Sequence, residues 1–283
     1  MKFIHLIFFL FIFSSSAFTQ KKLVTALPNY LNEISGLVFL NDSVLVAHND
    51  GGHEPKLYFL NLTGKVFHSI KVENALNVDW EDITIDPNGY LYIADIGNNN
   101  NLRKDLAIYK LNTRGILESK SILAEKISFT YPDQKSFPPA EKDLHFDAEG
   151  IAYFKDSLYI FTKCRAVPFD GKAYCYSLPT KAGNYVATKG IEYFIGKKGW
   201  WKDSVTATEI KNGKCYLLTY DRILIYTFTS RKLEFLKEIK LGVFSQREAI
   251  AVNSKGQIFI ADEEQKIVGG GNLYRIKIPK NGN

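Results

Sequence analysis

The chain has 283 residues, of which 46% are hydrophobic, and its formal net charge is +6. Its basic residues are scattered rather than clustered, which argues against a nucleic-acid-binding surface. The length and the hydrophobic content suit one large domain with a sizeable core.

The N-terminus predicts export. Lys2 precedes an apolar run at residues 3–13, and small residues lead to Ala17-Phe18-Thr19. This is the pattern of a secretory signal peptide, and the apolar run is too short for a spanning helix. We therefore predict a signal peptide at residues 1–19, a mature domain at 20–283 and a secreted or periplasmic location. We expect a monomer with no membrane span.

Five segments of the mature chain share one pattern: a strand, a polar turn and a second strand. They are SGLVFLNDSVLVAH, EDITIDPNGYLYIAD, EGIAYFKDSLYIFT, TEIKNGKCYLLTY and EAIAVNSKGQIFIAD. Turns such as Pro87-Asn88-Gly89 favour tight hairpins. A third strand with a tyrosine follows each segment, and a fourth follows most of them. Repeated units of four antiparallel strands predict an all-β fold, a β-propeller with five four-stranded blades.

The two ends of the repeat array predict how the ring closes. The last unit has no fourth strand of its own, and the segment at residues 22–27 can fill that place. Closure would remove the exposed strand edges. An insertion at residues 111–146 could hold a degenerate blade, which would make six. It offers one convincing strand where a blade needs four, so we predict five blades.

Acidic residues recur at one position of the repeat. In a propeller, the first strand of each blade starts at the channel mouth to which the second strand returns, so these residues should converge there. Crowded carboxylates raise one another's pKa and oppose folding unless a positive partner is present. Calcium prefers such oxygen ligands, whereas few cysteines and no paired histidine spacing argue against zinc or copper. The predicted metal ligands are Asp79, Glu81, Asp95, Asp147, Glu149, Glu248 and Asp262.

The acidic cluster could also be satisfied without a metal, in either of two ways. Arg103, Lys163, Arg222 and Arg247 lie in the same loops and could neutralise the carboxylates by ion pairs. Alternatively, acids at strand starts could accept hydrogen bonds from backbone N–H groups of the next blade. The residues predicted to contact a ligand at the mouth are Asn49, Asp50, Arg103, His145, Lys163 and Arg247.

The catalytic candidates are His48, Glu81 and Glu149, since a histidine or carboxylate near the mouth could act as a general base. The signatures of other hydrolases, G-x-S-x-G and H-E-x-x-H among them, do not occur in the sequence. Trp200-Trp201 could stack on a ligand at the rim or pack against the next blade.

Three cysteines make an odd count, so at least one thiol has no partner within the chain. Cys164 and Cys175 flank a predicted turn and could face each other across a hairpin. They could equally be small buried side chains, as could Cys215.

The motifs EISGL, HNDGG, VDWEDI, LYIADIGNN, FDAEGI, IFTK, VTATEI and REAIAV, in this order, resemble a group of exported bacterial propellers described as SdiA-regulated or esterase-like phytase proteins. The resemblance implies that Glu81, Asp95, Glu149 and Glu248 are mouth residues, with Lys163 and Arg103 beside them. It also implies relatives that include calcium-dependent lactonases, phosphatases and noncatalytic ligand binders. The fourth repeat departs from the pattern, because Thr208 stands where the others have an acid.

These observations predict an exported propeller with an acidic, calcium-binding mouth that binds a small molecule, a glycan or a protein. The alternative function is a calcium-dependent hydrolase of an ester, a lactone or a phosphoester.

Overall fold

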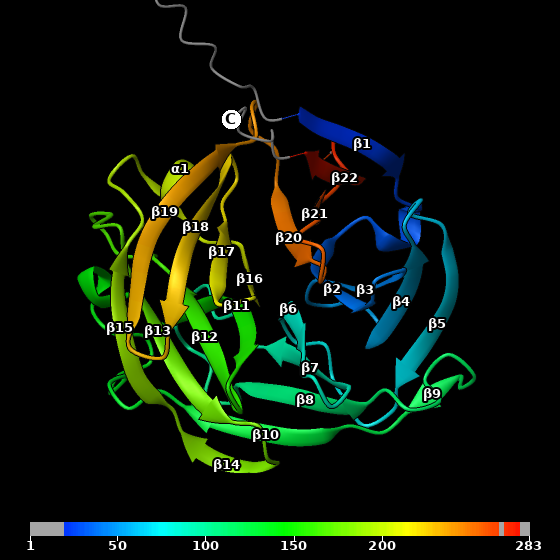
Figure 1. Ribbon diagram of the computed structural model, residues 1–283. Helices are drawn as coiled ribbons and strands as arrows, with labels where there is room; N and C mark the ends of the chain where they lie inside the picture. Colours follow the sequence, from blue (N-terminus) through cyan, green and yellow to red (C-terminus); the bar gives the residue numbers. More distant parts are fainter. Residues whose placement is uncertain (1–19, 266–268, 278–283) are drawn as a thin grey trace, which may run out of the picture.

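The protein is a five-bladed β-propeller, as predicted. A computed structural model describes residues 20–265 and 269–277. The predicted signal peptide at residues 1–19 lies outside the described residues. Five small sheets are arranged around a central axis, with one strand of each sheet nearest that axis (Figure 1).

Blades 1 and 2 each have a fifth strand. Blade 1 consists of β2 (Ile34–Asn41), β3 (Val44–Asn49), β4 (Lys56–Asn61), β5 (Val66–Val72) and the short β9 (Ser121–Ile122). Blade 2 consists of β6 (Trp80–Ile85), β7 (Tyr90–Asp95), β8 (Ala107–Asn112), β10 (Glu125–Thr130) and β14 (Gly183–Val186). β9 and β14 pair in parallel with the outer strands β5 and β10 and are contributed by later parts of the chain.

Blades 3 to 5 have four strands each. Blade 3 consists of β11 (Asp147–Phe154), β12 (Ser157–Lys163), β13 (Lys172–Pro179) and β15 (Thr188–Phe194). Blade 4 consists of β16 (Ala207–Lys211), β17 (Lys214–Leu218), β18 (Arg222–Thr229) and β19 (Lys232–Lys240). Blade 5 consists of β20 (Arg247–Val252), β21 (Ile258–Asp262), β22 (Asn272–Lys277) and β1 (Gln20–Ala26). Three short helices lie between strands: η1 (Asn29–Leu31), η2 (Glu141–Asp143) and α1 (Trp200–Asp203).

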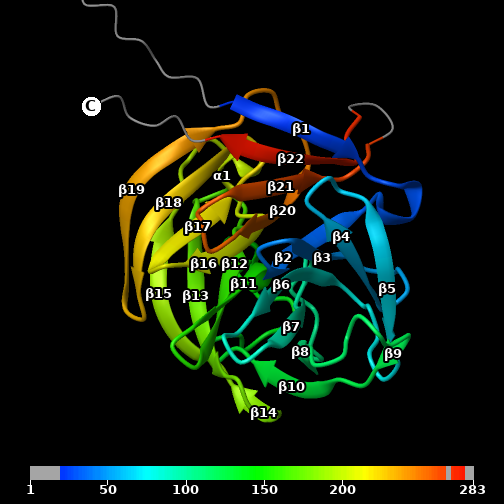
Figure 2. The same ribbon diagram turned by 45° about the vertical axis from the view of Figure 1, so that its right-hand side comes forward.

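The N-terminal strand closes the ring. β1 pairs antiparallel with β22 and so supplies the outer strand of the last blade, as the sequence predicted (Figure 2). The insertion at residues 111–146 forms β9, β10 and η2 rather than a sixth blade.

The core lies between the blades. Each of the five blade interfaces holds one cluster of buried hydrophobic side chains. Inner strands are therefore covered on both faces, which explains why nearly every residue of β6, β11 and β20 is buried. The packing of each blade on the next sets the angle between neighbouring blades, and thereby the diameter of the mouth.

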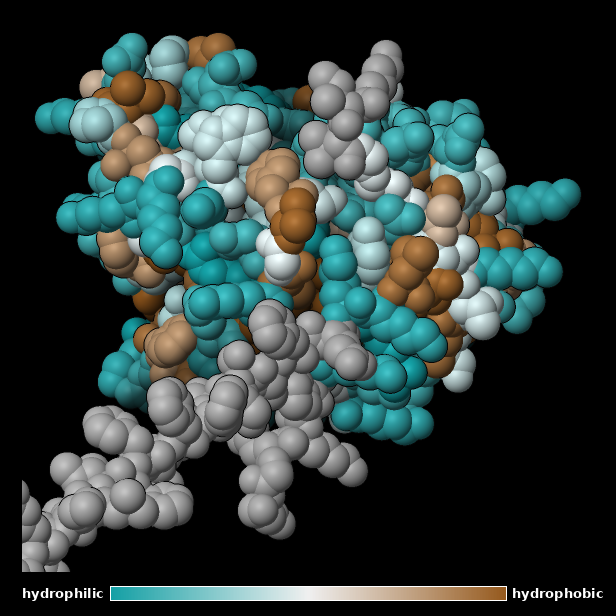
Figure 3. Space-filling view, turned by 90° about the horizontal axis from the view of Figure 1, so that it is seen from above, coloured by the Kyte–Doolittle hydropathy of each residue, from teal (hydrophilic) through white to brown (hydrophobic). Residues whose placement is uncertain are grey.

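The surface seen from the side of the termini is mixed. Small hydrophobic groups lie among hydrophilic side chains in that view (Figure 3). In the part of the chain that the structure describes, no helix has the length and the apolar character needed to cross a membrane.

Candidate metal and ligand site at the channel mouth

Four of the five inner strands carry a β-bulge at the same place. In β6, Trp80 pairs with Asp95 and Asp82 with Ala94, which leaves Glu81 as the extra residue. Glu149 in β11 and Glu248 in β20 are extra residues in the same way, and Ser35 takes this place in β2. A bulge re-aims the side chain of its extra residue. The fourth inner strand pairs continuously through Thr208, so blade 4 has neither the acid nor the bulge, whereas blade 1 keeps the bulge with Ser35 in place of the acid.

These bulged residues line one pocket at the mouth. Its volume is about 240 Å³, and all five blades contribute to its wall. The lining residues are Ser35, Asp50, Glu81, Asn99, Glu149, Lys163, Arg165, Trp200, Tyr220, Gln246, Glu248 and Glu263. Glu81, Glu149 and Glu248 therefore lie together on the wall of one pocket, as the repeat pattern predicted.

One group of carboxylates in the mouth is suited to a cation. Oxygens of Asp50, Asp79 and Glu81 lie within 4.8 Å of one another. The Glu81 residue is buried and lines the pocket, and its carboxylate makes no hydrogen bond among the described residues. Gly97 makes room for this group, because a Cβ there would come closer than 3.0 Å to the carboxylates of Glu81 and Asp79.

A second group shares Glu81 but is partly neutralised. Oxygens of Glu81, Asp147 and Glu149 also lie within 4.8 Å of one another. Lys163 Nζ is 3.0 Å from Glu149 Oε1, and Arg165 Nε donates to Asp147 Oδ2 at 2.6 Å. Ion pairs thus satisfy part of the cluster and leave the Asp50, Asp79 and Glu81 group with the excess negative charge.

Burial raises the pKa of most acids in the mouth. It raises that of Asp50 to about 6, that of Asp79 to about 7 and that of Glu263 to about 8, with neighbouring carboxylates adding to the effect. The pKa values of Glu81 and Glu248 are raised well above the ordinary range for the same reason. Burial also raises the pKa of Glu149, against the opposing effect of Lys163. A bound divalent cation would oppose the part of these shifts that neighbouring carboxylates cause, and the clustered oxygen donors fit a hard cation.

Two of the acids predicted as metal ligands support the mouth from outside the pocket wall. Asp95 accepts a hydrogen bond from the backbone of Asp79 at 3.0 Å and pairs with Arg103 at 2.9 Å. Asp262, at the matching strand end of blade 5, accepts from the backbone of Asn272 at 2.9 Å. Both carboxylates therefore hold loops rather than face the space where a ligand would bind.

Asp79, Asp147 and Arg103 are also not part of the pocket wall, and four further predicted site residues lie away from it. His48 is fully buried against Trp80, with the two rings 5.4 Å apart, and burial lowers its pKa to about 4. Asn49 donates to the carbonyl of Tyr30 at 2.9 Å. Arg247 is buried, and its guanidinium donates to the backbone carbonyls of Val243, at 2.8 Å, and Tyr220. His145 lies in the loop before β11, beside Asp170.

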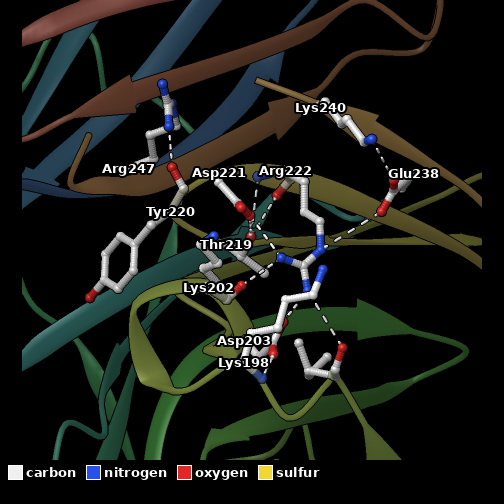
Figure 4. A network of polar contacts seen from close by, with 11 residues as sticks. Lys198, Lys202, Asp203, Thr219, Tyr220, Asp221, Arg222, Glu238, Lys240 and Arg247 are labelled. Atoms are coloured by element: carbon white, nitrogen blue, oxygen red, sulfur yellow. Dashed lines mark hydrogen bonds and ion pairs between the residues drawn. The ribbon is translucent and has the colours of Figure 1, made fainter. Parts of the chain in front are cut away.

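The helix α1 brings an aromatic side chain to the rim. Arg222 holds α1 in place by donating to the carbonyl of Lys202 at 2.7 Å and pairing with Asp203 and Asp221 (Figure 4). Trp200 and Trp201 stack on each other at 3.7 Å, and Trp201 contacts Phe244 at its edge. Trp200 is 41% exposed and lines the pocket, so an aromatic face borders the acidic mouth.

Asp82 lies deeper in the channel than Glu81. Its Oδ2 accepts hydrogen bonds from Ile151 N at 3.0 Å and Thr208 N at 3.1 Å, and its Oδ1 accepts from Ile83 N. One carboxyl group therefore joins the inner strands of blades 2, 3 and 4. This is the backbone-bridging role that the sequence left open for acids at strand starts.

All three cysteines are buried and unpaired. Cys164 and Cys175 do not form the disulfide that was one of the two sequence-based alternatives.

Sequence analysis did not assign several lining residues. Arg165 lies two residues beyond the end of β12, and Asn99 belongs to the loop after β7. Tyr220 and Glu263 follow second strands, a position that the repeat pattern directs to the mouth, although neither was given a role.

Comparisons with known proteins support the fold alone. No protein-family model matches the sequence, and no curated protein matches it either. Among solved structures, the chain is similar to a glutaminyl cyclase from Myxococcus xanthus, at 12% identity and a TM-score of 0.55, over 92% of this chain and 96% of that one. It is also similar to a luciferin-regenerating enzyme, at 11% identity and a TM-score of 0.53, over 92% and 95% of the two chains. At these identities the likeness shows a propeller and leaves the activity open.

Proposed function

We propose that the protein binds a divalent cation, calcium, at the channel mouth and uses this acidic site to bind a small, oxygen-rich ligand. The observation that carries the proposal is the group formed by Asp50, Asp79 and Glu81, in which the buried Glu81 carboxylate has no hydrogen-bond partner among the described residues. Calcium takes six to eight oxygen ligands, and three carboxylates leave positions for water and for ligand oxygens. Asn99 and Glu149 offer further side-chain oxygens on the pocket wall.

The pocket wall indicates the class of ligand. A volume of about 240 Å³ lies below the roughly 300–1,000 Å³ of pockets for drug-sized ligands, so the pocket suits a small molecule. The wall consists almost entirely of hydrogen-bonding side chains, with the face of Trp200 at its edge. A polyhydroxylated molecule of monosaccharide size, free or at the end of a glycan, matches this combination of polar groups and one aromatic face.

We also propose that the protein is exported and that it belongs to the group of propellers that its sequence motifs resemble. Export by the signal peptide at residues 1–19 would place the mouth where calcium is abundant. Membership of the SdiA-regulated or esterase-like phytase group is supported by the ordered motifs of the sequence.

Calcium titration tests the cation site. We expect calcium to raise the melting temperature of the purified protein and to bind in a calorimeter, and we expect Glu81→Gln and Asp79→Asn to lose most of both effects. Glu209→Gln is the matched control, because Glu209 is a buried acid that lines a different pocket. Equal calcium binding by Glu81→Gln and the wild type would refute the site.

One observation favours hydrolysis as a second candidate function. Glu263 lines the pocket with a pKa raised to about 8 and is therefore mostly protonated at neutral pH, as a general acid must be. A bound cation would polarise the carbonyl or phosphoryl oxygen of the substrate. Turnover of lactones, aryl esters or phosphoesters that requires both calcium and Glu263 would establish it. If calcium binds but none of these substrates is turned over, the result would favour ligand binding over hydrolysis.

A further inference from the structure

A second cluster of metal-binding side chains lies on blade 3, outside the mouth pocket. His145 precedes β11, Cys164 follows β12, and Asp170 lies in the loop before β13. One ligand atom from each of the three lies within 4.8 Å of the other two. The loop spacing of these residues matches no short metal-binding motif, so the tertiary structure alone brings them together.

Two contacts of the Asp170 carboxylate, one through each oxygen, have the lengths of ligand–ligand separations in a zinc site. Cys164 Sγ is 3.2 Å from Asp170 Oδ1, and His145 Nε2 is 3.4 Å from Asp170 Oδ2. Zinc bonds of about 2.0–2.3 Å at tetrahedral angles place neighbouring ligand atoms roughly 3.3–3.6 Å apart. Small side-chain adjustments would therefore suffice for one ion to contact all three groups.

The His145 ring has unmet hydrogen-bonding capacity. His145 is 7% exposed, and the Nδ1 of its ring has no hydrogen-bond partner among the described residues. Its Nε2 faces Asp170, and Tyr174 packs edge-on against the ring at 5.4 Å. An ion shared with Asp170 would bind Nε2, and Nδ1 would then carry the proton of the neutral ring.

The backbone holds the three residues in place. Arg165 N donates to the carbonyl of Leu144 at 2.9 Å, which joins the segment after Cys164 to the segment before His145. Lys172 N donates to Asp170 Oδ1 at 2.9 Å and fixes the orientation of that carboxylate. Side chains on rigid loops keep a coordination geometry that mobile loops would lose.

We propose that His145, Cys164 and Asp170 bind a transition-metal ion of the zinc class. One imidazole, one thiolate and one carboxylate are the ligand types that zinc prefers, and their charges balance a divalent ion. Asp170 is partly exposed, with its side chain 34% accessible, so water can occupy the fourth position. Cys164 stands between Lys163 and Arg165, so the ion would also brace the segment that carries these two cations to the mouth.

Cobalt provides a direct test, because a thiolate bound to Co²⁺ gives a charge-transfer absorption that oxygen ligands do not. The reduced, purified protein is titrated with Co²⁺ in excess calcium. We expect the thiolate band to appear at one equivalent, together with the visible absorption of tetrahedral cobalt, and Zn²⁺ to abolish both. His145→Gln and Asp170→Asn should weaken Co²⁺ binding about tenfold or more.

Two kinds of variant separate this site from other thiols and from the mouth. Cys164→Ser should abolish the thiolate band, whereas Cys175→Ser and Cys215→Ser, which replace equally buried cysteines elsewhere in the core, should retain it. Glu81→Gln should also retain it, so failure at the mouth and failure on blade 3 are distinguishable. Absence of the band in the wild type, or its persistence in Cys164→Ser, would overturn the proposal.

Discussion

Glu81 of blade 2 and Glu149 of blade 3 occupy equivalent bulges and, with Asp147, bring carboxylate oxygens within 4.8 Å of one another. Their environments differ, because Lys163 pairs with Glu149 at 3.0 Å while the Glu81 carboxylate has no such partner among the described residues. Equivalent backbone positions thus produce two chemically different carboxylates, one neutralised by the protein and one available to a cation.

Replacing Lys163 should have opposite effects on stability and on calcium affinity. Lys163→Met leaves Glu149 with only Arg165, at 3.4 Å, so we expect the free energy of unfolding without calcium to fall by about 3 kcal/mol. Removal of one positive charge from the mouth should strengthen calcium binding by about tenfold. Urea unfolding and calorimetry measure the two effects. Weaker calcium binding in this variant would contradict the electrostatic account of the mouth.

A side chain at position 97 should lower both the stability of the protein and its affinity for calcium. A Cβ at this position would come closer than 3.0 Å to the carboxylates of Glu81 and Asp79. We expect Gly97→Ala to lower the free energy of unfolding by about 1–3 kcal/mol and to weaken calcium binding, because both carboxylates must move. Combining it with Glu81→Ala should recover part of the lost stability. If the two substitutions were simply additive, the steric explanation would fail.

The stability of the calcium-free protein should decrease as the pH rises from about 4.5 to about 8. Glu263 has an ordinary pKa of 4.5 and a folded-state pKa of about 8, so the folded protein binds a proton that the unfolded chain releases in this window. Its contribution to stability is complete below pH 4.5 and is lost by pH 8. Glu263→Gln carries no titrating group there, so its melting temperature should fall less over the same range. Parallel curves for the two proteins would exclude Glu263 as the cause.

Asp82 should be the most sensitive acid for folding. Asp82→Ala removes the acceptor of three buried N–H groups, those of Ile83, Ile151 and Thr208, and each unsatisfied group costs about 1–3 kcal/mol. We expect a total loss of about 3–5 kcal/mol in urea unfolding. Asp42 on the surface, which accepts from Ser254 at 2.8 Å, provides the control, and Asp42→Ala should leave the stability nearly unchanged. Equal losses from the two variants would refute the bridging role of Asp82.

The architecture could be predicted from the order of residues alone. Alternating strands and turn residues are local signals, and their fivefold repetition predicted the blades, the closing role of the N-terminal strand and the gathering of Glu81, Glu149 and Glu248 at one mouth. These features follow from periodicity and from the symmetry of a propeller, both of which can be read without knowing any contact.

Which side chains face the ligand depends instead on how distant segments pack. His48, Asp95, Arg247 and Asp262 stand at the strand ends that the symmetry selects, yet each is directed into a loop or a blade interface by its own hydrogen bonds or packing. The bulges that expose the glutamates, the cations that neutralise Glu149 and the meeting of His145, Cys164 and Asp170 depend on strand register and loop packing. Such contacts have no local sequence signal, because the direction of one side chain is fixed by neighbours that lie far away along the chain.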